Sequence, residues 1–206
     1  MTKILQPGQS YTFSNYFQMS FPVEDILKEL DYNYTSQKLD LPVVENLPSS
    51  FEQLNTTINR NLRLTSLLTE DARKQAAIAP ILFEVCDYYQ TKLNIEYPVN
   101  AGEYLKGTLD YYIKNSKELL VVEAKNADLT RGFTQLAVEL IALAKINESE
   151  STKIYGAVTI GNIWKFGFLE QQEKLIYEDL NFYIVPDQLE ILFKILLGLL
   201  GTPVVE

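Results

Sequence analysis

Apolar residues recur at helical spacing in three longer segments of the chain. Residues 69–92 predict an amphipathic helix that Pro80 kinks or divides, and residues 131–146 predict a second helix, apolar on most sides and therefore buried. Residues 189–200 are strongly apolar but too short to cross a membrane, which predicts a buried or dimer-forming helix. A shorter helix is predicted over residues 23–30.

Short apolar runs between turn residues predict five strands. Three follow one another over residues 93–99, 107–113 and 118–125, separated by Asn-, Gly- and Ser-containing turns that suit a meander. Two more are expected over residues 154–160 and 163–170. The order helix, three strands, helix, strand, strand predicts an α/β fold of the α+β type, with a mixed sheet and helices on its faces.

The chain is expected to divide into three parts. Residues 1–60 contain several Pro and Gly residues that favour turns, which predicts an irregular, aromatic-rich extension that packs on the core. Residues 61–185 hold the predicted helices and strands of that core, and residues 186–206 hold the apolar C-terminal helix. With 206 residues and 47% apolar content, the chain can bury one sizeable core.

Charge and cysteine content qualify this picture. Acidic residues outnumber basic ones by 27 to 18, and the net charge of −9 disfavours a protein that coats nucleic acid. Such a function is compatible with this charge only if basic residues cluster locally or a metal supplies positive charge. The single cysteine, Cys86, and the absence of a recognisable signal peptide favour a cytoplasmic protein with no membrane association.

Several kinds of chemistry are excluded by residues that the chain lacks. It has no histidine, which removes Ser-His-Asp catalysis, Cys-His catalysis and His-ligated zinc. It also lacks the glycine-rich fingerprints of P-loop and dinucleotide-binding proteins. Any catalysis therefore has to use carboxylates, lysine, hydroxyl groups or a metal held by oxygen ligands.

Charged residues interrupt two neighbouring apolar strands. Glu123 and Lys125 project from the same face of their strand because strand side chains alternate, and Asp110 interrupts the strand before it. Taken alone, Glu123 and Lys125 are better explained as an ordinary ion pair at a strand end. Asp110 changes this, because two carboxylates on adjacent strands repel unless a cation lies between them. Mg²⁺ or Mn²⁺ suits such oxygen ligands, and a nearby lysine can stabilise charge on a phosphate.

This pattern resembles the PD-(D/E)XK, or restriction-endonuclease-like, nucleases. The resemblance covers residues 66–160 and rests on Asp110 in the second core strand and on Glu123-Ala124-Lys125 in the third. It implies metal binding by Asp110 and Glu123 and a catalytic role for Lys125. Members often add a glutamate in the first core helix, which matches Glu84 as a further metal ligand, and some add a catalytic glutamine in the second, which matches Gln135.

The sequence departs from the family pattern at two positions. Leu109 stands where the family name places proline, and Glu139 stands where a glutamine motif would continue with tyrosine. Basic residues close in sequence to the trio of Asp110, Glu123 and Lys125 are candidates for contact with nucleic acid, although lysines in turns are also commonly exposed to solvent without a partner. These candidates are Lys106, Lys114, Lys117 and Arg131.

Two interpretations follow. The first is a Mg²⁺- or Mn²⁺-dependent nuclease that hydrolyses phosphodiester bonds, with DNA as the favoured substrate. The second is a non-catalytic interaction module that keeps a nuclease-like fold, whose acidity and apolar C-terminal helix serve a protein partner or a homodimer. The carboxylate and lysine residues favour the enzyme, and the net charge favours the interaction module.

Overall fold

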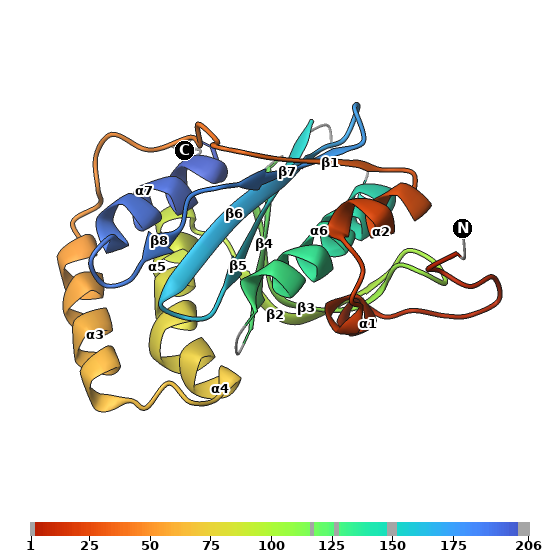
Figure 1. Ribbon diagram of the computed structural model, residues 1–206. Helices are drawn as coiled ribbons and strands as arrows, with labels where there is room; N and C mark the ends of the chain where they lie inside the picture. Colours follow the sequence, from red (N-terminus) through yellow and green to blue (C-terminus); the bar gives the residue numbers. More distant parts are fainter. Residues whose placement is uncertain (1–2, 116–117, 126–127, 148–151, 202–206) are drawn as a thin grey trace.

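The computed structural model of the chain describes residues 3–115, 118–125, 128–147 and 152–201. Within these residues the fold is a mixed α/β structure, as predicted, in which one sheet lies between two layers of helices (Figure 1). No helix in these ranges is both long enough and apolar enough to span a bilayer.

The described strands form a single mixed sheet of eight strands. Along the sheet the order is β1-β7-β6-β5-β4-β3-β2, and β8 pairs with β6. The pairs β4–β5 and β1–β7 are parallel and the other pairs are antiparallel. The strands are β1 (Asn33–Gln37), β2 (Leu93–Asn100), β3 (Lys106–Asn115), β4 (Glu118–Ala124), β5 (Lys153–Thr159), β6 (Ile163–Glu170), β7 (Leu175–Asp179) and β8 (Tyr183–Ile184).

The predicted long helix over residues 69–92 is divided into three pieces. A short α-helix is followed by one turn of π-helix, and Pro80 lies in the first turn of the next α-helix, a position that proline tolerates. The helical elements are α1 (Phe13–Gln18), α2 (Val23–Glu29), α3 (Phe51–Leu64), α4 (Glu70–Arg73), the π-helix η1 (Lys74–Ile78), α5 (Ala79–Tyr89), α6 (Leu129–Ile146) and α7 (Leu189–Leu199).

Each face of the sheet has its own apolar core. Helices α3, α5 and α7 cover one face, and α1, α2 and α6 cover the other (Figure 1). Alternation along β4 divides its residues between the two cores: Val122 and Ala124 pack with α5, whereas Val121 packs with α6. Glu123, which alternates with Val122 and Ala124, therefore faces α6.

The expectation of an irregular region over residues 1–60 was wrong in its local structure. Besides the predicted α2, this region forms α1, β1 and the start of α3. Strand β1 (sequence NYTSQ) has no alternating pattern and is held by parallel pairing with β7, which is distant in sequence. Helix α3 buries Phe51, Leu54 and Ile58 and is polar on its other faces, apart from Leu62 and the exposed Leu64. The division of the chain into an extension, a core and a C-terminal helix stays a prediction.

The apolar C-terminal segment forms α7 as predicted, and its apolar side chains are buried within one chain. Leu192, Phe193 and Leu196 are fully buried in the core that α7 shares with α5, and Ile191 is 38% exposed. Packing inside the chain thus accounts for the apolar character of the segment. A homodimer through α7 stays a prediction without support from this packing.

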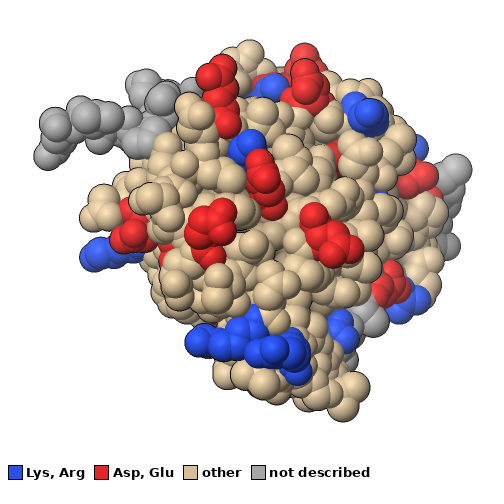
Figure 2. Space-filling model, turned by 90° about the vertical axis from the view of Figure 1, so that its left-hand side faces the viewer, with Lys and Arg blue, Asp and Glu red and all other residues tan. Residues whose placement is uncertain are grey.

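Charge is unevenly distributed over the face that carries α3 and α7. Acidic side chains are spread over the upper and middle parts of this face (Figure 2). Basic side chains gather at its lower end, where Figure 1 places the C-terminal part of α3 and the start of α4. An acidic chain thus has a local basic surface on this side.

Candidate functional site

Asp110 and Glu123 lie next to each other on neighbouring strands. The antiparallel pairing of β3 and β4 matches Tyr111 with Val122, which puts Asp110 and Glu123 level one position further on. The backbone N–H of Ala124 donates a hydrogen bond to Asp110 Oδ2 over 2.9 Å. The two predicted carboxylates therefore belong to one small region at the end of β4.

Lys125 and Glu123 form a largely buried ion pair. Lys125 Nζ lies 2.5 Å from Glu123 Oε1, and the two side chains are 13% and 2% exposed. The ammonium group of Lys125 also lies 4.9 Å from the centre of the Phe17 ring, which holds it from the side of α1. Asp110, Glu123 and Lys125 are thus brought together as the sequence predicted, whereas their chemical roles stay predictions.

The ionisation of this pair is shifted by its surroundings. Burial raises the pKa of the Glu123 carboxyl to about 7, and the negative charge of Asp110 adds to the effect, although Lys125 opposes it. Burial alone lowers the pKa of Lys125, but the charges of Glu123, Asp110 and Glu139 outweigh it and the pKa rises. Lys125 is therefore a cation at neutral pH, while Glu123 titrates close to neutrality.

Gln135 joins Glu123 to a third carboxylate, Glu139. Its side-chain amide, buried on α6, donates to Glu123 Oε1 on β4 over 2.6 Å and to Glu139 Oε1 on α6 over 2.8 Å. Burial, followed by the charge of Glu123, raises the pKa of Glu139 well above its ordinary value. The sequence predicted Gln135 but noted Glu139 only as a missing tyrosine. Its place one helical turn after Gln135 was the available signal.

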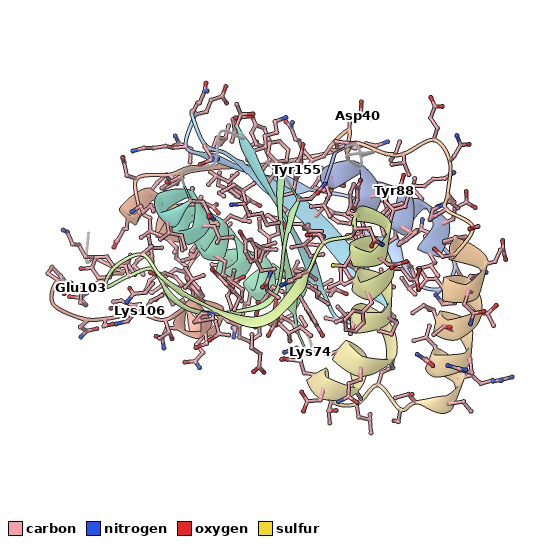
Figure 3. All side chains as sticks on the ribbon, turned by 180° about the vertical axis from the view of Figure 1, so that it is seen from behind. Asp40, Lys74, Tyr88, Glu103, Lys106 and Tyr155 are labelled. Carbon is pink, nitrogen blue, oxygen red and sulfur yellow. The ribbon has the colours of Figure 1, made fainter. Side chains whose placement is uncertain are left out.

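Lys74 is a second lysine at the site that sequence reasoning missed. It extends from η1, and its Nζ lies 2.7 Å from Asp110 Oδ1 and 3.0 Å from Glu70 Oε1 (Figure 3). Burial opposes its charge, but Asp110 and Glu70 prevail and raise the pKa of Lys74 above its ordinary value. Its spacing four residues after Glu70 predicts a helical ion pair, but nothing in the sequence indicates contact with β3.

Glu84 is not in contact with this group of residues. It lies half-exposed on α5, the helix that packs on the face of Val122 and Ala124, whereas Glu123 faces α6. Among the described residues, no hydrogen bond or ion pair links Glu84 to Asp110 or Glu123. The acidic residue of this helical segment that shares a partner with Asp110 is Glu70. The role of Glu84 as a metal ligand stays a prediction.

The predicted nucleic-acid contacts are dispersed. Lys106 and Lys114 lie four residues before and after Asp110 on β3, about 13 Å away at the usual rise per strand residue. Figure 3 places Lys106 beside Glu103 at the far end of the β2–β3 hairpin, well away from Lys74. Lys117 lies outside the described residues.

Arg131 is the predicted basic residue nearest to the trio. It occupies the first turn of α6, where its Nε lies 3.3 Å from Asp128, and its neighbour Gly132 packs against Lys125 so closely that an added Cβ would be 3.0 Å from Lys125 Cγ. A hollow of about 320 Å³ opens beside this turn. Its lining combines polar residues of α6 with apolar residues of the α1–α2 loop, among them Thr130, Arg131, Met19 and Phe21.

The available ligands suit a hard divalent cation. Glu123 Oε2, Glu139 Oε2 and Gln135 Oε1 are buried oxygen atoms without a hydrogen-bond partner in the described structure. Oxygen ligands fit Mg²⁺ or Mn²⁺ and do not fit a thiolate or imidazole zinc site. Within the described ranges, no three Asp, Glu or Cys side chains are already arranged as a metal cage. Sites of one or two carboxylates completed by water do not need such a cage.

No protein-family model, curated protein or solved structure matches the chain. The chemistry of the site is therefore the available guide to function. The site combines two partly buried lysines, Lys74 and Lys125, with the carboxylates of Asp110, Glu123 and Glu139.

Proposed function

We propose that the chain is a metal-dependent nuclease that hydrolyses phosphodiester bonds in nucleic acid, with DNA as the favoured substrate. The observation that carries this proposal is the convergence of Asp110, Glu123 and Lys125 at the end of β4, with Asp110 held by the Ala124 amide and Glu123 by Lys125. Carboxylates from adjacent strands and a lysine two residues further on make a minimal set for phosphodiester hydrolysis.

The order of elements supports the same proposal. Helix α5, the meander β2–β3–β4, helix α6 and the parallel strand β5 follow one another as in a restriction-endonuclease-like core. The proposed site lies where this arrangement brings the third strand and the second helix together. The order of elements is compatible with other α/β folds, so the residues of the site carry more weight than the topology.

Each residue has a defined part in the proposed reaction. Asp110 and Glu123 would hold Mg²⁺ or Mn²⁺, which when bound polarises the phosphate and makes water a better nucleophile. Lys125, a cation at neutral pH, would orient the attacking water and stabilise negative charge on the phosphoryl oxygens rather than accept a proton. Gln135 would position Glu123 through its amide, and Arg131 would contact a phosphate beside the site.

One observation favours the alternative, a non-catalytic interaction module. Asp110 and Glu123 are already neutralised by Lys74 and Lys125, and such pairs are stable without any metal. A nuclease needs at least one of these pairs to open when metal and substrate bind. The two functions therefore differ in whether a divalent cation binds at Asp110.

The decisive experiment combines cleavage and metal binding. Purified protein should cleave duplex or single-stranded DNA with Mg²⁺ or Mn²⁺ and not with EDTA, and Asp110→Asn and Lys125→Met should each reduce the rate by at least about a thousandfold. Mn²⁺ binding, followed by electron paramagnetic resonance, should weaken in Asp110→Asn. RNA in the same assay distinguishes the substrate class.

Matched controls remove charges of the same kind elsewhere. Asp87→Asn on α5 and Lys145→Met at the end of α6 alter exposed residues and should leave cleavage within about twofold of wild type. Cleavage that persists in both Asp110→Asn and Lys125→Met would exclude the proposed site. A wild-type protein that neither cleaves nor binds Mn²⁺ would favour the interaction module.

A further inference from the structure

The outward face of α3 differs in chemistry from its inward face. Leu54 and Ile58 are buried against the core, while Thr56, Arg60 and Arg63 follow one another at i, i+4 and i+7 on the exposed side. A hollow of about 610 Å³ lies along this side. Its lining contains amide, hydroxyl and guanidinium groups but no carboxylate: Asn55, Thr56, Asn59, Arg60 and Arg63.

The two arginines are not engaged by acidic residues. Within the described structure, no Asp or Glu lies within ion-pair distance of Arg60 or Arg63, whereas Arg131 pairs with Asp128 and Lys74 with Asp110. In a chain with 27 acidic residues, two such arginines on one helix face form a local positive surface. Guanidinium groups bind phosphate in a bidentate manner, and Asn and Thr side chains are common additional donors to phosphate.

The C-terminal part of α3 is hydrogen-bonded to the π-helix that carries Lys74. The Asn61 side-chain amide, between the two arginines in sequence, donates to the carbonyl of Ala76 in η1 over 3.0 Å. The same π-helix carries Lys74, which contacts Asp110. The basic end of α3 is thus attached to the segment that reaches the site. Figure 2 shows basic side chains gathered at this lower end of the molecule, below a more acidic surface.

We propose that the outward face of α3 binds the sugar-phosphate backbone of a nucleic acid through Arg60 and Arg63, outside the cleavage site. This inference rests on the proposed nuclease function for its choice of partner. It also resolves the objection from net charge, because the affinity comes from a local cluster on an otherwise acidic protein. Asn55 and Thr56 complete the surface with polar contacts, and the contacts are independent of base sequence.

Binding of a short fluorescent DNA duplex, measured by anisotropy in EDTA between about 50 and 200 mM NaCl, tests this inference. Arg60→Gln with Arg63→Gln should weaken binding about tenfold or more at the lower salt concentration and reduce the slope of log affinity against log salt by about 2. Arg60→Lys with Arg63→Lys keeps the charge and should preserve the slope. Lys38→Gln with Lys145→Gln removes two exposed charges elsewhere and should change binding less than twofold.

The outcomes separate this inference from the proposed function. If the wild-type protein binds DNA but never cleaves it, and the Arg→Gln double variant loses binding, the α3 surface is upheld and the nuclease is rejected. Cleavage with unchanged binding and salt slope in the same variant rejects the α3 surface alone. Failure of the wild-type protein to bind DNA at low salt overturns the inference. Arginine-dependent binding of polyglutamate or of anionic vesicles that is tighter than the binding of DNA also overturns the inference. Thermal unfolding should be unchanged in all three double variants, because the substituted side chains are exposed.

Discussion

Lys74 Nζ lies 2.7 Å from Asp110 Oδ1, although the two residues are 36 positions apart in the sequence. The contact is made from a turn of π-helix, a geometry that often marks functional sites. The Lys74 ammonium group lies beside the Asp110 carboxylate, where the proposed metal ion would otherwise supply the positive charge. In the proposed nuclease, Lys74 would neutralise Asp110 before a divalent ion binds and would compete with that ion for the carboxylate.

Replacing Lys74 by methionine should expose this competition. The side chains of Lys74 and Asp110 are 20% and 17% exposed, so the variant leaves a largely buried carboxylate without its cation. We expect the free energy of unfolding to fall by about 1–3 kcal/mol in EDTA and to recover in part with Mg²⁺. Urea unfolding with and without Mg²⁺ measures both effects. Lys194→Met, which breaks a helical pair with the exposed Glu190, should cost only about 0.5 kcal/mol under either condition. Equal losses in the two variants would contradict the assignment.

Glu139 should make stability depend on pH. Its pKa is raised in the folded state by burial and by Glu123, so the folded protein holds this proton more tightly than the unfolded chain does. The corresponding stability is fully present below the ordinary Glu value of 4.5 and is lost as pH rises through the raised pKa. We expect Glu139→Gln, which resembles the protonated form, to be about as stable as wild type near pH 4.5 and more stable at alkaline pH.

Urea unfolding of both proteins between pH 4.5 and 9 measures this difference. Glu123 and Glu139 interact, so the difference between the two proteins reports on the pair of carboxyl groups. A Glu173→Gln variant, which alters an exposed glutamate in the turn between β6 and β7, should run parallel to wild type over the whole range. A wild-type protein that gains stability relative to Glu139→Gln with rising pH would show that the carboxylate is charged and paired.

The two glutamates of the α4–α5 segment should differ in their effect on metal dependence. Glu70 shares Lys74 with Asp110, whereas Glu84 lies half-exposed on α5. We expect Glu70→Gln to raise the Mn²⁺ concentration for half-maximal cleavage by about threefold or more, and Glu84→Gln to change it by less than about twofold. The two substitutions are chemically identical and control for each other. A larger shift in Glu84→Gln would restore Glu84 as the metal ligand from this segment.

Periodicity was sufficient to predict the central elements of the fold. The meander, α6, β5 and β6 bury strongly apolar faces, and their alternating or helical spacing is visible in the sequence. Strands β1 and β7 were missed for a physical reason: they are short, and they owe their structure to each other although they are far apart in the sequence, through the parallel pairing of Asn33–Gln37 with β7. Helix α3 was also missed, although Phe51, Leu54 and Ile58 recur at helical spacing.

The residues of the candidate site also fall into those that the sequence predicts and those that it does not. Asp110, Glu123 and Lys125 could be predicted because charges that interrupt apolar strands are conspicuous, and Gln135 because a resemblance supplied it. Lys74 could not be predicted, since it acts through a contact between separate elements. Glu139 was missed although it lies one helical turn after Gln135 on the same helix. Sequence spacing along one helix does not reveal which strand that helix will meet. The residues missed are those that set the charge balance around the predicted ones.

The pairing of β1 with β7 has a consequence for solubility. Without β1, strand β7 would present an open row of N–H and C=O groups at the border of the sheet, which invites pairing with other chains. Strand β1 is five residues long and polar, so it forms a border less prone to such pairing, and at the opposite border β2 carries Glu96 and Pro98. We therefore expect a fragment that begins after Gln37 to self-associate, because it lacks β1 at this border as well as the core residues of α1 and α2.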